Sequence, residues 1–158
     1  MPRPRTLANR AGHGRPLLGG TIGRVRVRGI HHLGVAVADL DEAVETWERL
    51  FGARVEHRDS LETQGVDAVS LLVGDSRIEL LAATGEDTPV GRFLARRGPG
   101  MHHVALATDD INGALRDLDA AGAQLIDQIP RRGLYGLEVA FVHPDAVHGV
   151  LTEVVSTD

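Results

Sequence analysis

Residues 100–111 read GMHHVALATDDI, and residues 29–40, seventy-one positions earlier, read GIHHLGVAVADL. Each copy has a glycine, an apolar residue, a His doublet, a run of mostly apolar or small residues, and an Asp followed by an apolar residue. A second pair of matching stretches lies later in each half, IELL at 78–81 and TEVV at 152–155. A repeat on this scale predicts two similar structural units packed together.

Each copy of the doublet begins a stretch that is typical of a buried strand followed by a helix. Asp39 or Asp41 is expected to cap the first helix, whose apolar stripe reaches Phe51 before Gly52 ends it. Asp110 is expected to cap the second helix. The remaining strands are expected at 53–59, 66–73 and 77–82, and at 124–129, 137–143 and 150–155, with a turn at 131–133. We therefore predict an α+β fold, in which two tandem βαβββ modules form a curled mixed sheet around a cup.

The composition sets the domain boundaries and excludes several chemistries. The chain has 158 residues, no Cys, and Arg at all 17 basic positions, so thiolate ligands and a Schiff-base lysine are ruled out. Residues 1–28 are expected to be a disordered basic arm, 29–83 the first module, 84–99 a linker with a short helix that begins at Thr88-Pro89, and 100–158 the second module. The remaining body is acidic, which argues against nucleic acid as a partner. We expect no membrane span and a cytoplasmic location.

One His and one Glu recur at matching positions of the two modules, which predicts a single site with four ligands. Because side chains alternate along a strand, the inner His of each doublet is expected to face the cup, beside small residues, while His31 and His102 face away. Two imidazoles and two carboxylates suit an octahedral divalent ion such as Co, Ni, Mn, Fe or Zn, with two positions left open. The predicted ligands are His32, Glu79, His103 and Glu153.

Several short motifs spread over the body are similar to those of one protein family. They read IHHLG at 30–34, TQGV at 63–66, GMHHVA at 100–105, IDQIPR at 126–131, FVHP at 141–144 and GVLTE at 149–153. On these motifs, the chain from Ile30 to Val155 resembles the methylmalonyl-CoA epimerase branch of the vicinal oxygen chelate (glyoxalase/dioxygenase) superfamily. The resemblance implies the same four metal ligands. Many bacterial members have Gln where this chain has Glu79.

The resemblance also implies a reaction. Members of this branch remove the proton between a carboxylate and a thioester carbonyl, stabilise the enolate by chelation to the metal, and return the proton on the opposite face. Glu153 is the candidate for one base. Bacterial relatives often carry the second carboxylate four residues after the Gln of the QGV motif, which is Ala68 here. The adjacent Asp67 is the candidate second base if the local register differs.

The implied substrate is an acyl-CoA thioester, whose phosphates need cations. Arg97, Arg131 and Arg132 are candidates for that role, and Gln64 and His143 are further candidate substrate contacts within the family motifs. A homodimer is also expected.

Two other classes of function stay open at this point. One is a different enzyme of the superfamily, such as a glyoxalase I-type isomerase or a natural-product tailoring enzyme. The other is a metal-free ligand-binding member, which a measurement of bound metal would distinguish from both enzyme classes.

Overall fold

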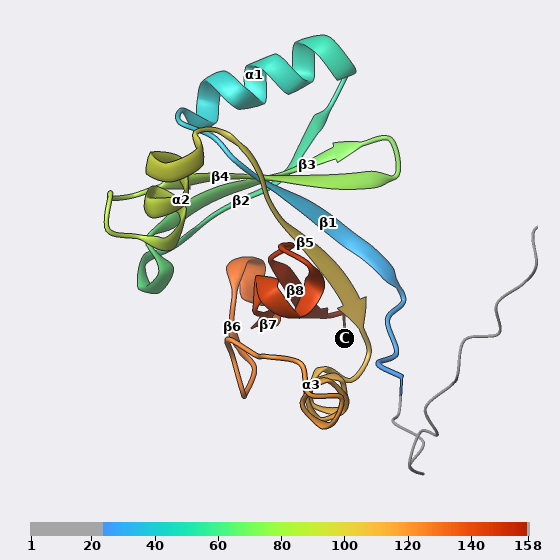
Figure 1. Cartoon of the computed structure of the whole chain (residues 1–158). Coiled ribbons are helices and arrows are strands. Elements are labelled where there is room, and N and C mark those ends of the chain that lie inside the picture. Colours follow the sequence, from blue (N-terminus) through green and yellow to red (C-terminus); the bar gives the residue numbers. More distant parts are fainter. Residues whose placement is uncertain (1–23, 158) are drawn as a thin grey trace, which may run out of the picture.

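The computed structural model describes residues 24–157, which form one continuous eight-stranded sheet with three α-helices and three short 3-10 helices (Figure 1). The strand order is β2-β3-β4-β1-β5-β8-β7-β6. The strands are β1 (Gly29–Ala36), β2 (Arg54–Leu61), β3 (Val66–Val73), β4 (Ser76–Ala83), β5 (Gly100–Thr108), β6 (Arg131–Arg132), β7 (Glu138–Val142) and β8 (Thr152–Ser156). The helices are α1 (Leu40–Phe51), α2 (Pro89–Arg97) and α3 (Ile111–Ala120), and the 3-10 segments are η1 (Glu62–Gln64), η2 (Leu134–Gly136) and η3 (Pro144–Val147).

The two modules meet at a single seam, where β1 and β5 pair antiparallel at the centre of the sheet. Within each module the first strand pairs parallel with the last one, β1 with β4 and β5 with β8, while the other pairs are antiparallel. This arrangement is the predicted tandem βαβββ fold with a mixed sheet. The parallel pairs are the feature that brings the His strand and the Glu strand of each module side by side.

The two long helices cover the two ends of the sheet, α1 over the first module and α3 over the second (Figure 1). The Asp39 carboxylate caps α1 by accepting from the Glu42 backbone N–H at 2.9 Å. The Asp110 carboxylate caps α3 in the same way, accepting from the Gly113 N–H at 2.8 Å. Short polar side chains at this position satisfy backbone donors that the first turn leaves free, which explains why both helices begin where the sequence predicts.

Residues 84–99 contain the predicted linking helix. The Thr88 hydroxyl caps α2 by accepting from the Gly91 N–H at 3.0 Å, and Pro89 occupies the first turn, where no backbone donor is required. The buried side chain of α2, Val90, packs against a cluster that includes Val66, Ala68 and Leu81. The linker thus closes one side of the first module's cup.

The second module departs from the prediction at its outer strand. No strand forms over 124–129; a single bridge joins Leu125 to Val142, and β6 occupies Arg131–Arg132, where a turn was expected. Backbone hydrogen bonds still join the two segments, as from the Ile126 N–H to the Phe141 carbonyl at 2.9 Å, but the Asp127 carboxylate takes the Phe141 N–H at 2.8 Å. Competition of this kind between Asp side chains and a backbone ladder is common.

One smaller expectation was also wrong, and a second can be compared with the structure only at residues 24–28. Leu50 and Phe51 were assigned to the buried stripe of α1, but they are 56% and 61% exposed, so the buried stripe ends at the half-buried Trp47. The expected disordered arm covers residues 1–28, of which 1–23 lie outside the described residues. The last five are tied to the second module: Val25 packs on its core, and the Arg28 N–H donates to the Ala107 carbonyl at 2.8 Å.

Within residues 24–157, no helix is long and apolar enough to cross a membrane.

Candidate active site

The four predicted ligand side chains come from the four central strands, and pairing within the sheet explains how they meet. Gly34 on β1 lies opposite both Glu79 on β4 and His103 on β5. Ala105 on β5 lies opposite both Glu153 on β8 and His32 on β1. A small residue in each central strand therefore leaves room for the His and Glu beside it. A Cβ on Gly34 would stand 2.2 Å from the His103 ring, so even Ala would not fit without movement.

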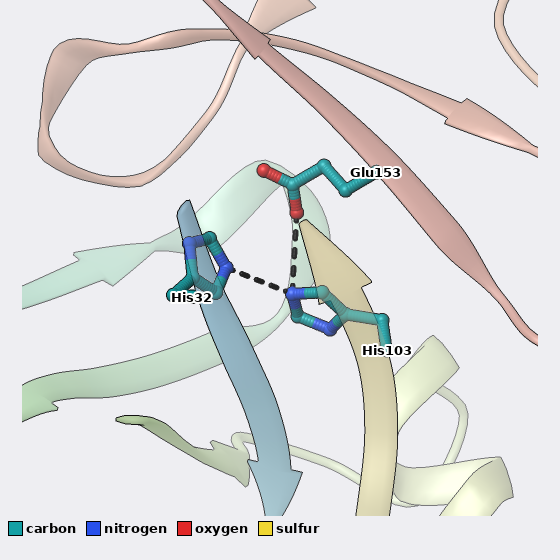
Figure 2. A group of neighbouring side chains, drawn as sticks. All are labelled: His32, His103 and Glu153. Atoms are coloured by element: carbon teal, nitrogen blue, oxygen red, sulfur yellow. Dashed lines mark hydrogen bonds and ion pairs between the residues drawn. The ribbon is translucent and has the colours of Figure 1, made fainter. Parts of the chain in front are cut away.

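The four polar ends converge on one buried point. The His32 and His103 Nε2 atoms are 3.0 Å apart, and a Glu153 carboxylate oxygen lies 3.3 Å from His103 Nε2 (Figure 2). One Glu79 oxygen lies 3.3 Å from His32 Nε2 and 3.6 Å from His103 Nε2. The tightest group, whose ligand atoms all lie within 4.8 Å of one another, is His32, His103 and Glu153. Glu79 reaches both imidazoles but stands slightly outside that group.

Burial and the neighbouring charges set the protonation of this group. Burial lowers the pKa of His32, but the hydrogen bond and charge of Glu79 outweigh it, so the net pKa is raised. Burial, together with the neighbouring His32 and His102, lowers the pKa of His103 well below its ordinary value. Burial raises the pKa of Glu153 to about 8, against the opposing effect of His32. A cation at the centre would favour the ionised carboxylates and the neutral imidazoles together.

The outer histidines of the doublets lie beside the site, contrary to the prediction that they face away. His31 Nδ1 is 2.8 Å from His32 Nδ1, and His102 Nδ1 is 3.0 Å from His103 Nδ1. The pairing of β1 with β5 skips His31 on one strand and His102 on the other, so each doublet sits at a β-bulge. A bulge interrupts the alternation of faces, which is why the period-two argument failed here.

These features fit a divalent metal ion. Two cis ligand atoms at about 2.1 Å from an octahedral ion are about 3.0 Å apart, which is the separation of the two Nε2 atoms. The donor set of two nitrogens and two carboxylates suits such ions. The Nδ1 atoms each have a polar partner in the neighbouring ring, which is the arrangement that orients an imidazole toward a metal.

The centre lies against a cavity of about 490 Å³ formed by both modules. Its apolar wall includes Val66, Leu81, Leu134 and Phe141, and the titratable side chains that line it beyond the four ligands are His31, Glu56, His57, Arg77, His102, Arg131 and Tyr135. Glu56 and Arg77 hold each other through two hydrogen bonds of 2.8 Å. The Arg77 hydrogen bond is the main reason why the pKa of Glu56 falls to about 2.

The predicted substrate contacts divide into two groups. Gln64 and Arg131 line the cavity, with the Arg131 guanidinium 5.4 Å from the centre of the Phe141 ring and its Nε 3.1 Å from an Asp127 oxygen. The other three do not line it. Arg97 lies 5.7 Å from the centre of the Phe93 ring, Arg132 is exposed, and His143 accepts from the Asp145 N–H at the start of η3.

The candidate second base is also away from the cavity. Asp67 accepts a hydrogen bond of 2.6 Å from the Ser60 hydroxyl on the neighbouring β2 and is not among the lining residues. Val66 and Ser70, which share the other face of β3, do line the cavity. The register is regular at this point, since Asp67 pairs with Ser60 and Ala82 without a bulge. The shift that would have turned Asp67 inward is therefore not present.

Sequence reasoning missed three groups of the site: the outer histidines, the Glu56–Arg77 pair and Tyr135. The duplicated doublet was a usable signal for the first, because an alternating strand does not need His at two adjacent positions. The Glu56–Arg77 pair and Tyr135 depend on contacts between segments far apart in the sequence, and no local pattern predicts such contacts.

Comparison with known proteins places the chain in a family. The profile of the "Glyoxalase/Bleomycin resistance protein/Dioxygenase superfamily" matches residues 31–141. A mitochondrial methylmalonyl-CoA epimerase of Dictyostelium discoideum is 32% identical, with 97% of this chain and 92% of that protein covered.

Two solved structures have the same fold. A variant of the Streptomyces coelicolor methylmalonyl-CoA epimerase in complex with 2-nitronate-propionyl-CoA is 38% identical, covers 83% of this chain and 98% of its own, and has a TM-score of 0.81. The Mycobacterium tuberculosis methylmalonyl-CoA epimerase is 32% identical, with coverages of 90% and 93% and a TM-score of 0.80. This chain therefore belongs to the glyoxalase/bleomycin resistance protein/dioxygenase superfamily.

Proposed function

We propose that the chain is an isomerase that epimerises methylmalonyl-CoA, or a similar acyl-CoA thioester, at C2. The observation that carries the proposal is the buried cluster of two His and two Glu side chains at a cavity, in a chain similar over most of its length to proteins named methylmalonyl-CoA epimerase. A solved relative bound to a CoA thioester supports the substrate class.

His32, Glu79, His103 and Glu153 would hold the metal, and we take cobalt, nickel, manganese, iron and zinc as candidates. A divalent ion there supplies Lewis-acid stabilisation of the negative charge that develops on the substrate oxygens when the C2 proton leaves. The four side chains set the position of that charge by converging from both modules, and the small residues Gly34 and Ala105 let them do so without strain.

Glu153 is our candidate for the base that takes the C2 proton. Its side chain is 8% exposed and borders the cavity, so its carboxylate can reach a substrate held there while water is largely excluded. A divalent ion bound beside it would keep this carboxylate ionised, which is the form that can accept a proton. The apolar wall of the cavity strengthens these charge interactions by keeping the local dielectric low.

Recognition of the acyl-CoA is assigned to the cavity residues Gln64 and Arg131. Arg131 is half-buried, and its contact with Asp127 holds the guanidinium in one orientation.

We also propose a homodimer, which is supported by the exposed apolar side chains of Ile30 and Met101 on the two seam strands. A cytoplasmic location is proposed in keeping with an acyl-CoA substrate. Light scattering tests the first, and localisation of a tagged chain tests the second.

The direct test is a reaction in heavy water with one epimer of methylmalonyl-CoA and each metal in turn. We expect deuterium at C2 and inversion of that centre, followed by mass spectrometry and by chiral analysis. Neither exchange nor inversion by the metal-loaded protein would contradict the proposal and would favour a glyoxalase I-type or tailoring reaction. A protein that binds no divalent metal would favour a ligand-binding role.

A further inference from the structure

Inversion at C2 needs a second proton-carrying group, on the face of the substrate opposite Glu153. This requirement follows from the proposed epimerase function, on which the present inference rests. Asp67 faces away from the cavity, and Ala68, buried on β3, has no proton to give. The second group must therefore be found among the other titratable side chains that line the cavity.

Most of those side chains already have a partner that restricts them. Glu56 is held by Arg77 and by the Ser70 hydroxyl at 3.0 Å, and its low pKa keeps it ionised. The rings of His31 and His102 contact the Nδ1 atoms of the two candidate ligands. Each of these groups would have to break an existing interaction before it could meet a substrate.

Two of these side chains have no such restriction. His57 on β2 has its ring 5.7 Å from the ring of Tyr135. The Tyr135 hydroxyl differs from all the others. It is buried, it belongs to a cavity-lining residue, and it has no hydrogen-bond partner among the described residues. A buried hydroxyl without a partner is unusual, because leaving it unsatisfied costs free energy that a partner would recover. A bound substrate is the natural candidate for that partner.

Backbone conformation and contacts with the first module fix the position of Tyr135. Tyr135 has φ 59° and ψ 18°, a left-handed conformation that a non-glycine residue adopts only when its surroundings impose it. The Tyr135 N–H donates to an Asp59 oxygen on β2 at 2.6 Å, and the ring lies 5.7 Å from the ring of His57. A loop of the second module is thus fixed against the outer strand of the first.

This placement puts the ring on the first module's side of the cavity. Tyr135 packs on the cluster of the first module that contains Ala68, whereas Glu153 lies on β8 of the second. Three strands, β4, β1 and β5, separate β3 from β8 in the curled sheet, so the two groups approach the cavity from different sides. Burial, followed by the charge of Glu79, raises the pKa of Tyr135, so its phenol is protonated and able to donate.

We propose that the Tyr135 hydroxyl is the second catalytic proton carrier, acting on the face of C2 opposite Glu153. In one direction, the Glu153 carboxylate takes the C2 proton, and the electrons of the C–H bond pass into the thioester as an enolate. The O–H bond of Tyr135 then breaks, its proton bonds to C2 from the other face, and the electron pair stays on the phenolate oxygen. After product release, the proton on Glu153 returns to Tyr135 through water in the open cavity. The reverse reaction retraces these steps: a proton first passes from Tyr135 to Glu153 through water, the phenolate then takes the C2 proton, and Glu153 returns its proton to the other face of C2.

The variant Tyr135→Phe tests the proposal in the metal-loaded protein. Inversion should fall by about 100-fold or more, because the general acid is gone. Exchange of the C2 proton in heavy water should persist for the epimer whose proton faces Glu153 and be lost for the other. Metal content should not change. Equal inversion by the variant and the parent would overturn the proposal, as would loss of exchange from both epimers with metal retained.

Tyr135 is the single tyrosine of the chain, which permits a second test that leaves the fold almost unaltered. Growth on fluorotyrosine replaces this one phenol by a more acidic one. The alkaline limb of the inversion rate should move to lower pH, and a fluorine resonance should shift when methylmalonyl-CoA binds. An unmoved pH profile and resonance would exclude Tyr135. A parent protein that neither exchanges nor inverts would instead contradict the epimerase function itself, so the two failures are distinguishable.

Discussion

The two halves of the sheet supply matching candidate ligands but different parts of the cavity wall. Each half gives one His from its first strand and one Glu from its last, and each His sits beside the small residue of the other half. The outer strands do not match: β2 has eight residues, whereas β6 has two. Residues 124–137 at this edge, which include β6 and η2, bring Arg131 and Tyr135 to the cavity. The comparison shows that the repeated parts bring the four candidate ligands together, whereas the divergent edge of the second half adds its own side chains to the cavity wall.

Removing ligands one at a time is the strongest way to break this comparison. We expect His32→Ala, Glu79→Ala, His103→Ala and Glu153→Ala each to weaken divalent metal binding by at least about 100-fold, more than the loss of an outer partner produces. Equilibrium dialysis with Co²⁺ measures the affinity, and circular dichroism checks that the fold survives. Wild-type affinity in Glu79→Ala would show that the two halves do not contribute equally, in line with the tighter grouping of the other three residues.

A second test exploits the small residues at the seam. Gly34→Ala should lower the free energy of unfolding by about 2 kcal/mol and weaken metal binding, because the new Cβ would meet the His103 ring at 2.2 Å. The matched change in the other half, Ala105→Gly, should cost about 1 kcal/mol or less and leave the metal site formed. Urea unfolding gives both values. An equal loss from the two variants would mean that steric fit to His103 is not the cause.

The outer histidines provide a smaller effect that should be the same in both halves. We expect His31→Ala and His102→Ala each to reduce metal affinity about tenfold, since they orient the ligand imidazoles through the Nδ1 contacts. Titration with Co²⁺ under the conditions used for the ligand variants measures this. If only one of the two variants binds metal more weakly, the two outer histidines do not have the same role, although both lie at matching bulges.

The smallest expected effect belongs to one half only. Glu56→Gln should destabilise the protein by about 1 kcal/mol at neutral pH, a modest value because Arg77 is 40% exposed and solvent screens the pair. The pKa of Glu56 is lowered to about 2, so the stabilisation is full above the ordinary pKa of about 4.5 and is lost as the pH falls toward 2. Unfolding curves of the two proteins should therefore converge over that range. A difference that persists at pH 2 would argue against the ion pair.

The sequence predicted those features that follow from the internal repeat or from the alternation of side chains along a strand. The Asp caps of α1 and α3 and the hairpin of β3 and β4 follow from patterns within about ten residues, and the four convergent side chains follow from the repeat of such patterns in the two halves of the chain. The bulges at His31 and His102 do not, because they are set by pairing across the seam. Tyr135 was missed for the same reason: its conformation depends on Asp59, 76 residues away. At 124–129, where a strand was expected, the Asp127 carboxylate accepts the Phe141 N–H. Hydrophobic spacing does not predict this hydrogen bond.

The seam between β1 and β5 has a further consequence for how the chain behaves as a whole. Since each half provides two of the four ligands, neither half alone contains a complete coordination set. A cation held there would bind the folded protein, in which the two halves are in contact, and not the unfolded chain. It would therefore stabilise the fold. At a concentration 100 times its dissociation constant, it would add about 2.7 kcal/mol to the free energy of unfolding. Metal supply would then set the thermal stability of the protein as well as its activity, and chelation would remove this contribution to the free energy of unfolding.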